Sequence, residues 1–119
     1  MKVNDNYESK IWLGLQEGYS SKFFDSWEVT QFIKDYCSKK GQCVTVTPTN
    51  FIYVNGQEPG LIIGFINYPR YPMSKAELRN RTIELGKLLM EEYKQFRVSL
   101  TFYPAQPGGV MMLENEEME

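Results

Sequence analysis

The residues with the most distinctive chemistry lie in a short stretch, Asn67–Pro72, in which Arg70 stands between two tyrosines. A guanidinium donates a planar fork of hydrogen bonds to a carboxylate or phosphate, and tyrosine rings can stack on it. Two further arginines follow in the first turns of an expected helix, whose N-terminus attracts anions. The stretch therefore predicts a site for a small, nucleotide-like anion, formed by Tyr68, Arg70, Tyr71, Arg79 and Arg81.

The same stretch has a simpler interpretation. Its two prolines fix φ and disfavour helix immediately before them, so the segment can act as a stiff connector whose tyrosines pack on the next helix. A second cleft could combine Glu17, Tyr19, Tyr53 and Arg97 at the other end of the domain. An ion pair between Glu17 and Arg97 on neighbouring strands would account for those charges equally well.

Other kinds of catalytic centre find little support. The chain has no histidine, the commonest general base and metal ligand. Cys37 and Cys43 are spaced for neither a zinc nor a redox motif, and the hydrophobic periodicity places them on opposite faces of successive elements. We therefore expect two free thiols in a reducing cytoplasm, no metal site and no cofactor. No glycine-rich phosphate-binding motif occurs.

The charge balance limits the possible partners. The 119 residues include 13 basic and 15 acidic side chains, for a net charge of −2, so a strongly basic nucleic-acid-binding protein is excluded. Trp12 could stack on an RNA base, but the basic and aromatic stretch of RNA-recognition modules is missing from Gly60–Phe65. The N-terminus lacks a signal sequence, and the longest apolar run, Leu61–Ile66, is too short to cross a membrane.

The elements that would position these residues follow from periodicity and caps. Asp25 with Glu28, and Ser74 with Glu77, have the spacing of capping boxes at helix starts. Gly41 suits a helix end, whereas Pro48 indicates that its strand lies at a sheet edge or carries a bulge. Alternation and helical periodicity predict strands at 10–16, 42–54, 61–68 and 96–103, a short strand at 110–113, and helices at 25–40 and 74–94.

The order β-α-β-β-α-β resembles the ferredoxin-like fold, an α+β sandwich. That resemblance implies an antiparallel sheet of order 4-1-3-2 with both helices on one face, and a possible short fifth strand at the C-terminus. We expect one domain over residues 1–113 and a disordered acidic tail over residues 114–119. The resemblance covers topology alone and implies no chemistry.

One strand does not alternate as a half-exposed sheet requires. The segment Leu61–Ile66 is apolar on both sides, so the sheet face without helices would carry an apolar patch. Self-association as a homodimer, binding of another protein, or cover by the segment around Val110–Leu113 would each bury it, and the patch could also form a ligand cleft. The predicted interface residues are Trp12, Phe51, Tyr53, Ile62 and Ile66.

Together these features predict a small, non-enzymatic interaction protein, regulatory or inhibitory, that acts as a homodimer through its sheet face. Its composition would suit a viral protein. The alternative is a domain that binds a small anionic ligand through the Arg70 cluster. An enzyme is the weakest hypothesis, because no acid–base pair is visible in the sequence.

Overall fold

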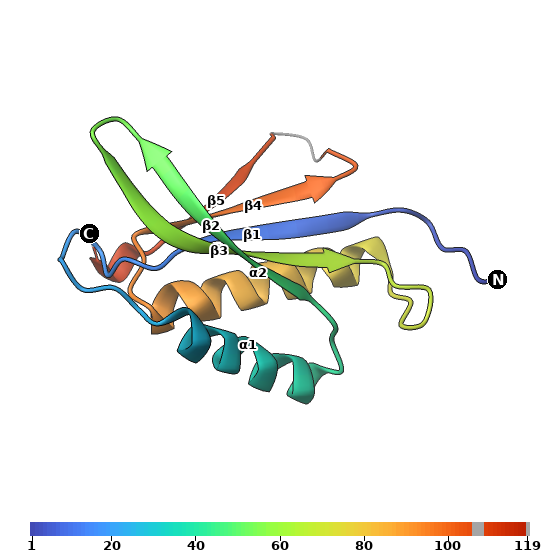
Figure 1. The fold of residues 1–119 in the computed structure, drawn as a ribbon. Coiled ribbons are helices and arrows are strands. Elements are labelled where there is room, and N and C mark those ends of the chain that lie inside the picture. Colours follow the sequence, from blue (N-terminus) through green and yellow to red (C-terminus); the bar gives the residue numbers. More distant parts are fainter. Residues whose placement is uncertain (106–108, 119) are drawn as a thin grey trace.

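The computed structural model describes residues 1–105 and 109–118. It shows a five-stranded antiparallel sheet with two helices on one face (Figure 1). This α+β architecture confirms the predicted ferredoxin-like sandwich. The elements are β1 (Glu8–Gly14), α1 (Ser26–Lys40), β2 (Thr45–Tyr53), β3 (Gly56–Ile66), α2 (Lys75–Glu92), β4 (Arg97–Tyr103), β5 (Met111–Glu114) and a short 3₁₀ helix (Glu116–Met118).

The strand order is β2-β3-β1-β4-β5. Its first four strands are the predicted order, and the edge position of β2 agrees with Pro48, which cannot donate to a ladder. The fifth strand also forms as predicted. The suggestion that residues 110–113 fold over the helix-free face is wrong, because β5 pairs beside β4 and widens the sheet instead of covering it.

Both helices begin and end where local chemistry favours it. The Asp25 carboxylate accepts a hydrogen bond from the backbone N–H of Trp27, and Ser74 accepts one from the N–H of Glu77. Gly41 ends α1 with a φ of 65°, in the left-handed region that glycine tolerates best. These caps fix the positions at which the chain leaves and rejoins the sheet.

The hydrophobic core lies between the sheet and the helices. Alternate strand residues such as Ile11, Ile63 and Leu100 are fully buried there. Gly86 in the middle of α2 allows a close approach, because a Cβ at this position would lie 3.1 Å from Leu113 and 3.2 Å from Leu100. The glycine therefore costs helix propensity but lets α2 lie against β4 and β5.

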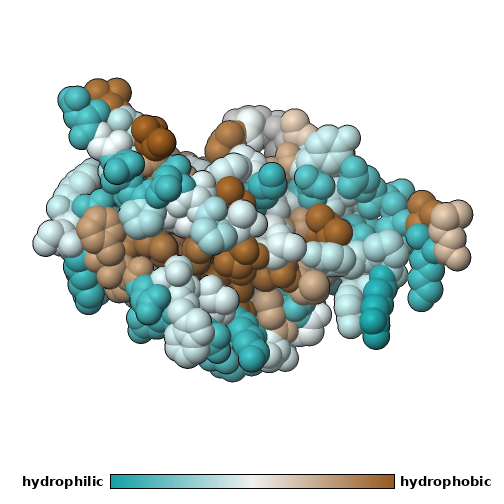
Figure 2. Space-filling model, in the orientation of Figure 1, coloured by the Kyte–Doolittle hydropathy of each residue, from teal (hydrophilic) through white to brown (hydrophobic). Residues whose placement is uncertain are grey.

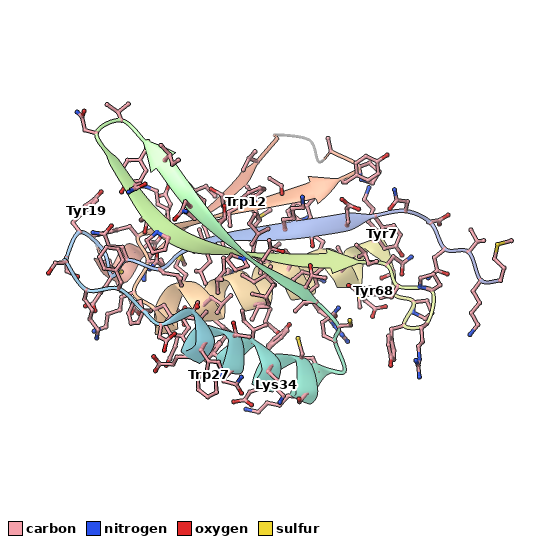
Figure 3. The ribbon with its side chains drawn as sticks, viewed as in Figure 1. Tyr7, Trp12, Tyr19, Trp27, Lys34 and Tyr68 are labelled. Carbon is pink, nitrogen blue, oxygen red and sulfur yellow. The ribbon has the colours of Figure 1, made fainter. Side chains whose placement is uncertain are left out.

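The other face of the sheet is uncovered by any described helix, and we call it the open face. The registers of β1 with β3 and of β2 with β3 place the five predicted interface residues on this face. Trp12 lies at its centre, on the side away from the helices (Figure 3). Self-association through this face stays a prediction, which the solution mass would test.

The C-terminal segment continues past the expected domain boundary. Glu114 is the last residue of β5, and the backbone N–H of the buried Asn115 donates to the carbonyl of Phe96. Glu119 lies outside the described residues, so the acidic tail is not described to its end. Among the described residues, no helix has the length and hydropathy needed to cross a membrane.

Candidate functional site

A carboxylate is held against the chain where β1 ends. Glu58 lies on β3, on the open face, and its Oε2 accepts a hydrogen bond of 3.2 Å from the backbone N–H of Gln16. Directly beneath this oxygen is Gly14, where a Cβ would lie only 2.8 Å from Oε2. The glycine therefore makes the room in which the carboxylate sits.

A buried side-chain amide also lies next to Gly14. Gln95, 6% exposed, donates from Nε2 to the carbonyls of Gln16 at 2.7 Å and Tyr93 at 2.9 Å. Because Nε2 is engaged with two acceptors, the orientation of the amide is set and its Oε1 points elsewhere. That Oε1 lies 3.1 Å from the Cβ position of Gly14, beside the Glu58 carboxylate. Two acceptor oxygens thus converge above one glycine.

An aromatic ring adjoins these acceptors. Phe51 on β2 pairs directly with Glu58, and its ring lies over Gly60, where a Cβ would collide with it. Tyr53 lies in the same way against Gly56. Glycines on β3 therefore leave slots for aromatic side chains of β2, so that rings and carboxylate share one part of the open face.

We call Gly14, Gln16, Phe51, Glu58 and Gln95 the Glu58 cluster. It lies where the β2–β3 hairpin leaves the body of the molecule, as Figure 1 shows. The hairpin tip carries the exposed side chains of Ile52 and Val54. Figure 2 shows apolar surface on the part of the molecule that projects at the upper left. On the helix side of the same strands is a cavity of about 370 Å³, lined in part by Leu15, Phe24 and Pro59.

Chemically, the Glu58 cluster suits a ligand with positive charge or hydrogen-bond donors. A carboxylate and an amide oxygen attract cations and accept from hydroxyl or amino groups. The face of an aromatic ring also attracts a cation. Glu17, at the same end, is engaged with Lys22 at 3.5 Å and Lys94 at 3.9 Å, so its charge is partly compensated.

The residues of the predicted anion site are distributed over several local structures. Arg70 lies 5.6 Å from the ring of Tyr71, whereas Arg81 donates to the side chain of Gln42 at 2.9 Å. Tyr68 is at the end of the sheet opposite the hairpin (Figure 3). Burial, and then a hydrogen bond with Cys43, raises the pKa of this tyrosine.

The Asn67–Pro72 segment is anchored to the N-terminus. Asn67 accepts a hydrogen bond from the backbone N–H of Met73 at 3.0 Å and donates to the carbonyl of Asp5 at 3.1 Å. The Tyr7 hydroxyl donates to the carbonyl of Met73. These bonds make the segment a held connector, as the simpler interpretation expects. Arg79 lies in α2, whereas Arg70 lies in the connector before that helix.

Four of the five residues of the Glu58 cluster were not predicted from the sequence as site residues, namely Gly14, Gln16, Glu58 and Gln95. Glu58 has no distinguishing signal in the sequence, because the Pro59 and Gly60 that follow it are typical of a turn. Gln16 and Gln95 are polar residues without a motif. The signal that could have found them is glycine on the open face, since Gly14 and Gly60 mark places where another group approaches the backbone.

Comparisons with known proteins were made for the whole chain. No protein-family model matches it, and no curated protein does. Two solved structures share its fold. A phage SAM lyase in the apo state aligns with a TM-score of 0.78 and 18% identity over 92% of this chain and 90% of that one. A phage SAM lyase in complex with S-methyl-5'-thioadenosine aligns with a TM-score of 0.81 and 17% identity over 100% of this chain and 97% of that one.

These neighbours correct the functional expectation. Both are structures of an enzyme, so the non-enzymatic interaction protein predicted from the sequence is wrong. The absence of histidine does not exclude a reaction, because other side chains can act in catalysis. The phage source of both neighbours fits the viral composition noted in the sequence.

Proposed function

We propose that this chain is a lyase that cleaves S-adenosylmethionine and releases S-methyl-5'-thioadenosine. The observation that carries the proposal is the Glu58 cluster, in which two acceptor oxygens and an aromatic ring meet on the open face. The fold also supports the proposal, because each of the two phage SAM lyase structures aligns with this chain over nearly its full length.

The chemistry of the substrate explains why a site without histidine can catalyse this cleavage. The sulfonium sulfur of S-adenosylmethionine already carries the positive charge that makes it a good leaving group. When the bond from sulfur to the γ-carbon of the methionine part breaks, sulfur keeps the electron pair and leaves as a neutral thioether. No general acid is needed to protonate it, so the usual acid–base pair is dispensable.

Each member of the cluster has a role in this proposal. The Glu58 carboxylate and the Phe51 ring attract the sulfonium cation by charge and by cation–π interaction. The Oε1 of Gln95 accepts a hydrogen bond from a donor group of the substrate. Gln16 holds both partners, through its N–H to Glu58 and its carbonyl to Gln95. The pair is thereby oriented before the substrate arrives.

A lyase uses no water, so the four-carbon fragment has two possible fates. It can lose a proton to give an unsaturated amino acid, or its own carboxylate can attack the γ-carbon to close a lactone. Both balance with one neutral thioether leaving. We place the protein in the cytoplasm, which agrees with two unbridged cysteines.

The test is release of S-methyl-5'-thioadenosine from S-adenosylmethionine by the purified chain, followed by chromatography. Glu58→Gln keeps the shape of the side chain but removes its charge. We expect it to lower kcat/KM by roughly a hundredfold, in the range of other lost transition-state charge interactions. Mass spectrometry of the four-carbon product separates the two fates.

The matched control is Glu8→Gln, a carboxylate on the same sheet face at the opposite end of β1. Its kcat/KM should equal that of the unmodified chain. Equal loss in both variants would show a general effect of face charge and would contradict the assignment to Glu58. No thioadenosine product from the unmodified chain would contradict the lyase itself.

A further inference from the structure

Two thiols line one cavity on the helix side of the molecule, away from the Glu58 cluster. The cavity is about 350 Å³ and includes Cys37, near the end of α1, and Cys43, just before β2. Cys37 is half-buried and Cys43 is exposed. The alternation of the sequence placed the two side chains on opposite faces, and the end of α1 explains why the structure does not.

The chain reverses direction between the two cysteines. Gly41 adopts the left-handed conformation, and the backbone N–H groups of Gly41 and Gln42 both donate to the carbonyl of Cys37, the second at 3.0 Å. The bond from Gln42 is the 6→1 bond of a Schellman motif, and the bond from Gly41 is the 5→1 bond of an αL cap. Both bonds fold the residues after the helix back onto its last turn. Cys43 therefore lies in a loop that returns toward the end of α1, and not in a strand.

Side-chain hydrogen bonds hold this returning loop in place. Gln42 donates to the carbonyl of Cys43 at 3.0 Å and accepts from Arg81 of α2 at 2.9 Å. The backbone on both sides of the thiol pair is thus fixed to a helix. Two thiols that line one cavity on a fixed backbone can react with each other more readily than with an outside thiol.

We propose that Cys37 and Cys43 are a reactive pair that closes to an intramolecular disulfide on exposure to a small disulfide such as glutathione disulfide. The Cys43 thiolate attacks one sulfur of glutathione disulfide and displaces a first glutathione thiolate. The Cys37 thiolate then attacks the Cys43 sulfur and displaces a second. Both cysteines are oxidised, one glutathione disulfide is reduced to two glutathiones, and each departing thiolate takes up a proton released by a cysteine.

The surroundings of the two thiols give this order of events. Cys43 is accessible to a bulky reagent, whereas Cys37 packs partly against the core. Burial, and then the proximity of Cys43, raises the pKa of the Cys37 thiol, which leaves less of its thiolate to meet an outside reagent. The same thiol can still act as the resolving partner, because its target is already in the cavity. This inference does not depend on the proposed lyase activity.

The test treats the folded chain with excess glutathione disulfide and follows its intact mass. We expect the end product to be a monomer lighter by two hydrogen atoms. Trypsin cuts after Lys34, Lys39 and Lys40, so the bridge would link peptides 35–39 and 41–70 until a reductant is added. A lasting glutathione adduct on Cys43, a disulfide-linked dimer, or no reaction would each overturn the proposal.

Two single variants serve as matched controls. Cys37→Ser should stop at the adduct, heavier by one bound glutathione, because the resolving thiol is gone. Cys43→Ser should react far more slowly. The contribution of the fold is measured by varying the ratio of glutathione disulfide to glutathione, once with the folded chain and once in urea. In urea we expect the bridge to form only at a more oxidising ratio. An unchanged ratio in urea would show that sequence proximity alone pairs the thiols, which contradicts a role for the folded cavity.

Discussion

The two faces of the sheet are built from the same strands but differ in what they bury. On the covered face, neighbouring strands present Ile11, Ile63 and Leu100, which are fully buried against the helices. On the open face, the residues next to these in each strand are Trp12, Ile62 and Ser99, which the same pairings bring together. The covered face is mostly apolar, with Ser9 hydrogen-bonded to Thr82 of α2, whereas the open face mixes rings, hydroxyls, glycines and a carboxylate.

This difference separates stability from chemistry. Apolar area removed from water stabilises the covered face by about 25 cal/mol per Å². Glycines on the open face do the opposite, since glycine inside a strand costs roughly 0.5–1 kcal/mol against alanine. Gly60 and Gly14 are nevertheless placed where a ring and a carboxylate need room. The open face therefore gives up some stability at the positions that assemble the Glu58 cluster.

The largest expected effect comes from adjacent residues of β3 that point to opposite faces. Phe65 is fully buried on the covered face, while Ile66 is 40% exposed on the open one. Phe65→Ala should lower the free energy of unfolding by about 3–5 kcal/mol, because it leaves a cavity in the core. Ile66→Ala should lower it by less than about 1 kcal/mol. Denaturant titration measures both.

If Phe65→Ala does not fold, Ile63→Val probes the same covered face at a cost of about 0.5–1.5 kcal/mol. Similar losses for Phe65→Ala and Ile66→Ala would break the comparison. They would mean that something buries the open face in solution, as the predicted self-association would do.

An intermediate loss of stability is expected from substitution of Gly60, which lies beneath the ring of Phe51. A Cβ there would meet the Phe51 ring and would lie 2.6 Å from the backbone carbonyl oxygen of Leu13, which cannot rotate away. Gly60→Ala should therefore cost about 1–3 kcal/mol of stability, the usual cost of overpacking. It should also lower lyase activity, because the ring beside Glu58 must move.

The control for this variant is Gly64→Ala on the same strand and face. Its Cβ would lie 2.6 Å from Thr45 Oγ1, a side-chain atom that can change rotamer. The loss of stability should be smaller and the activity retained. Equal losses of activity at both glycines would show that the slot under Phe51 has no special role.

The smallest effect is expected on the helix surface, away from both sheet faces. Glu84 accepts a hydrogen bond from Tyr36 at 2.9 Å and pairs with Lys40 at 3.1 Å. The hydrogen bond from Tyr36, followed by that from Lys40, holds the pKa of the Glu84 carboxyl below its ordinary value. The group is exposed, so the contribution to stability at neutral pH should be under about 1 kcal/mol.

The sign of the pH dependence follows from that lowered pKa. The carboxylate stabilises the fold above the ordinary carboxyl pKa of about 4, and this contribution is lost as the pH falls through the lower, folded-state value. Denaturant titrations should show that the unmodified chain has a slightly higher free energy of unfolding than Glu84→Gln at neutral pH. This difference should disappear in acid. A growing advantage in acid would contradict the assignment.

Much of the fold could be predicted because its signals are local. Ser74 and Asp25 cap helices with their own side chains, and Gly41 ends one by its backbone freedom. Pro48 identified the edge strand, because a missing donor excludes any central position. The alternation of β1 and β4 followed from one face being buried. Each of these signals depends on a few neighbouring residues.

The candidate site could not be predicted in the same way, because its members come from four separate segments. Glu58, Gln95 and Gln16 are brought together by strand pairing and by the return of the chain after α2. The two cysteines show the same limit on a smaller scale, since a turn of three residues decides whether they share a cavity.

The sequence by itself determined the order of elements, the covered face and the edge strand, since caps, prolines and apolar periodicity act over a few residues. Only the tertiary structure decided which polar groups meet on the open face. A carboxylate, an amide and a ring carry no shared periodicity, so nothing short of the packed sheet could show that Glu58 and Gln95 converge above Gly14.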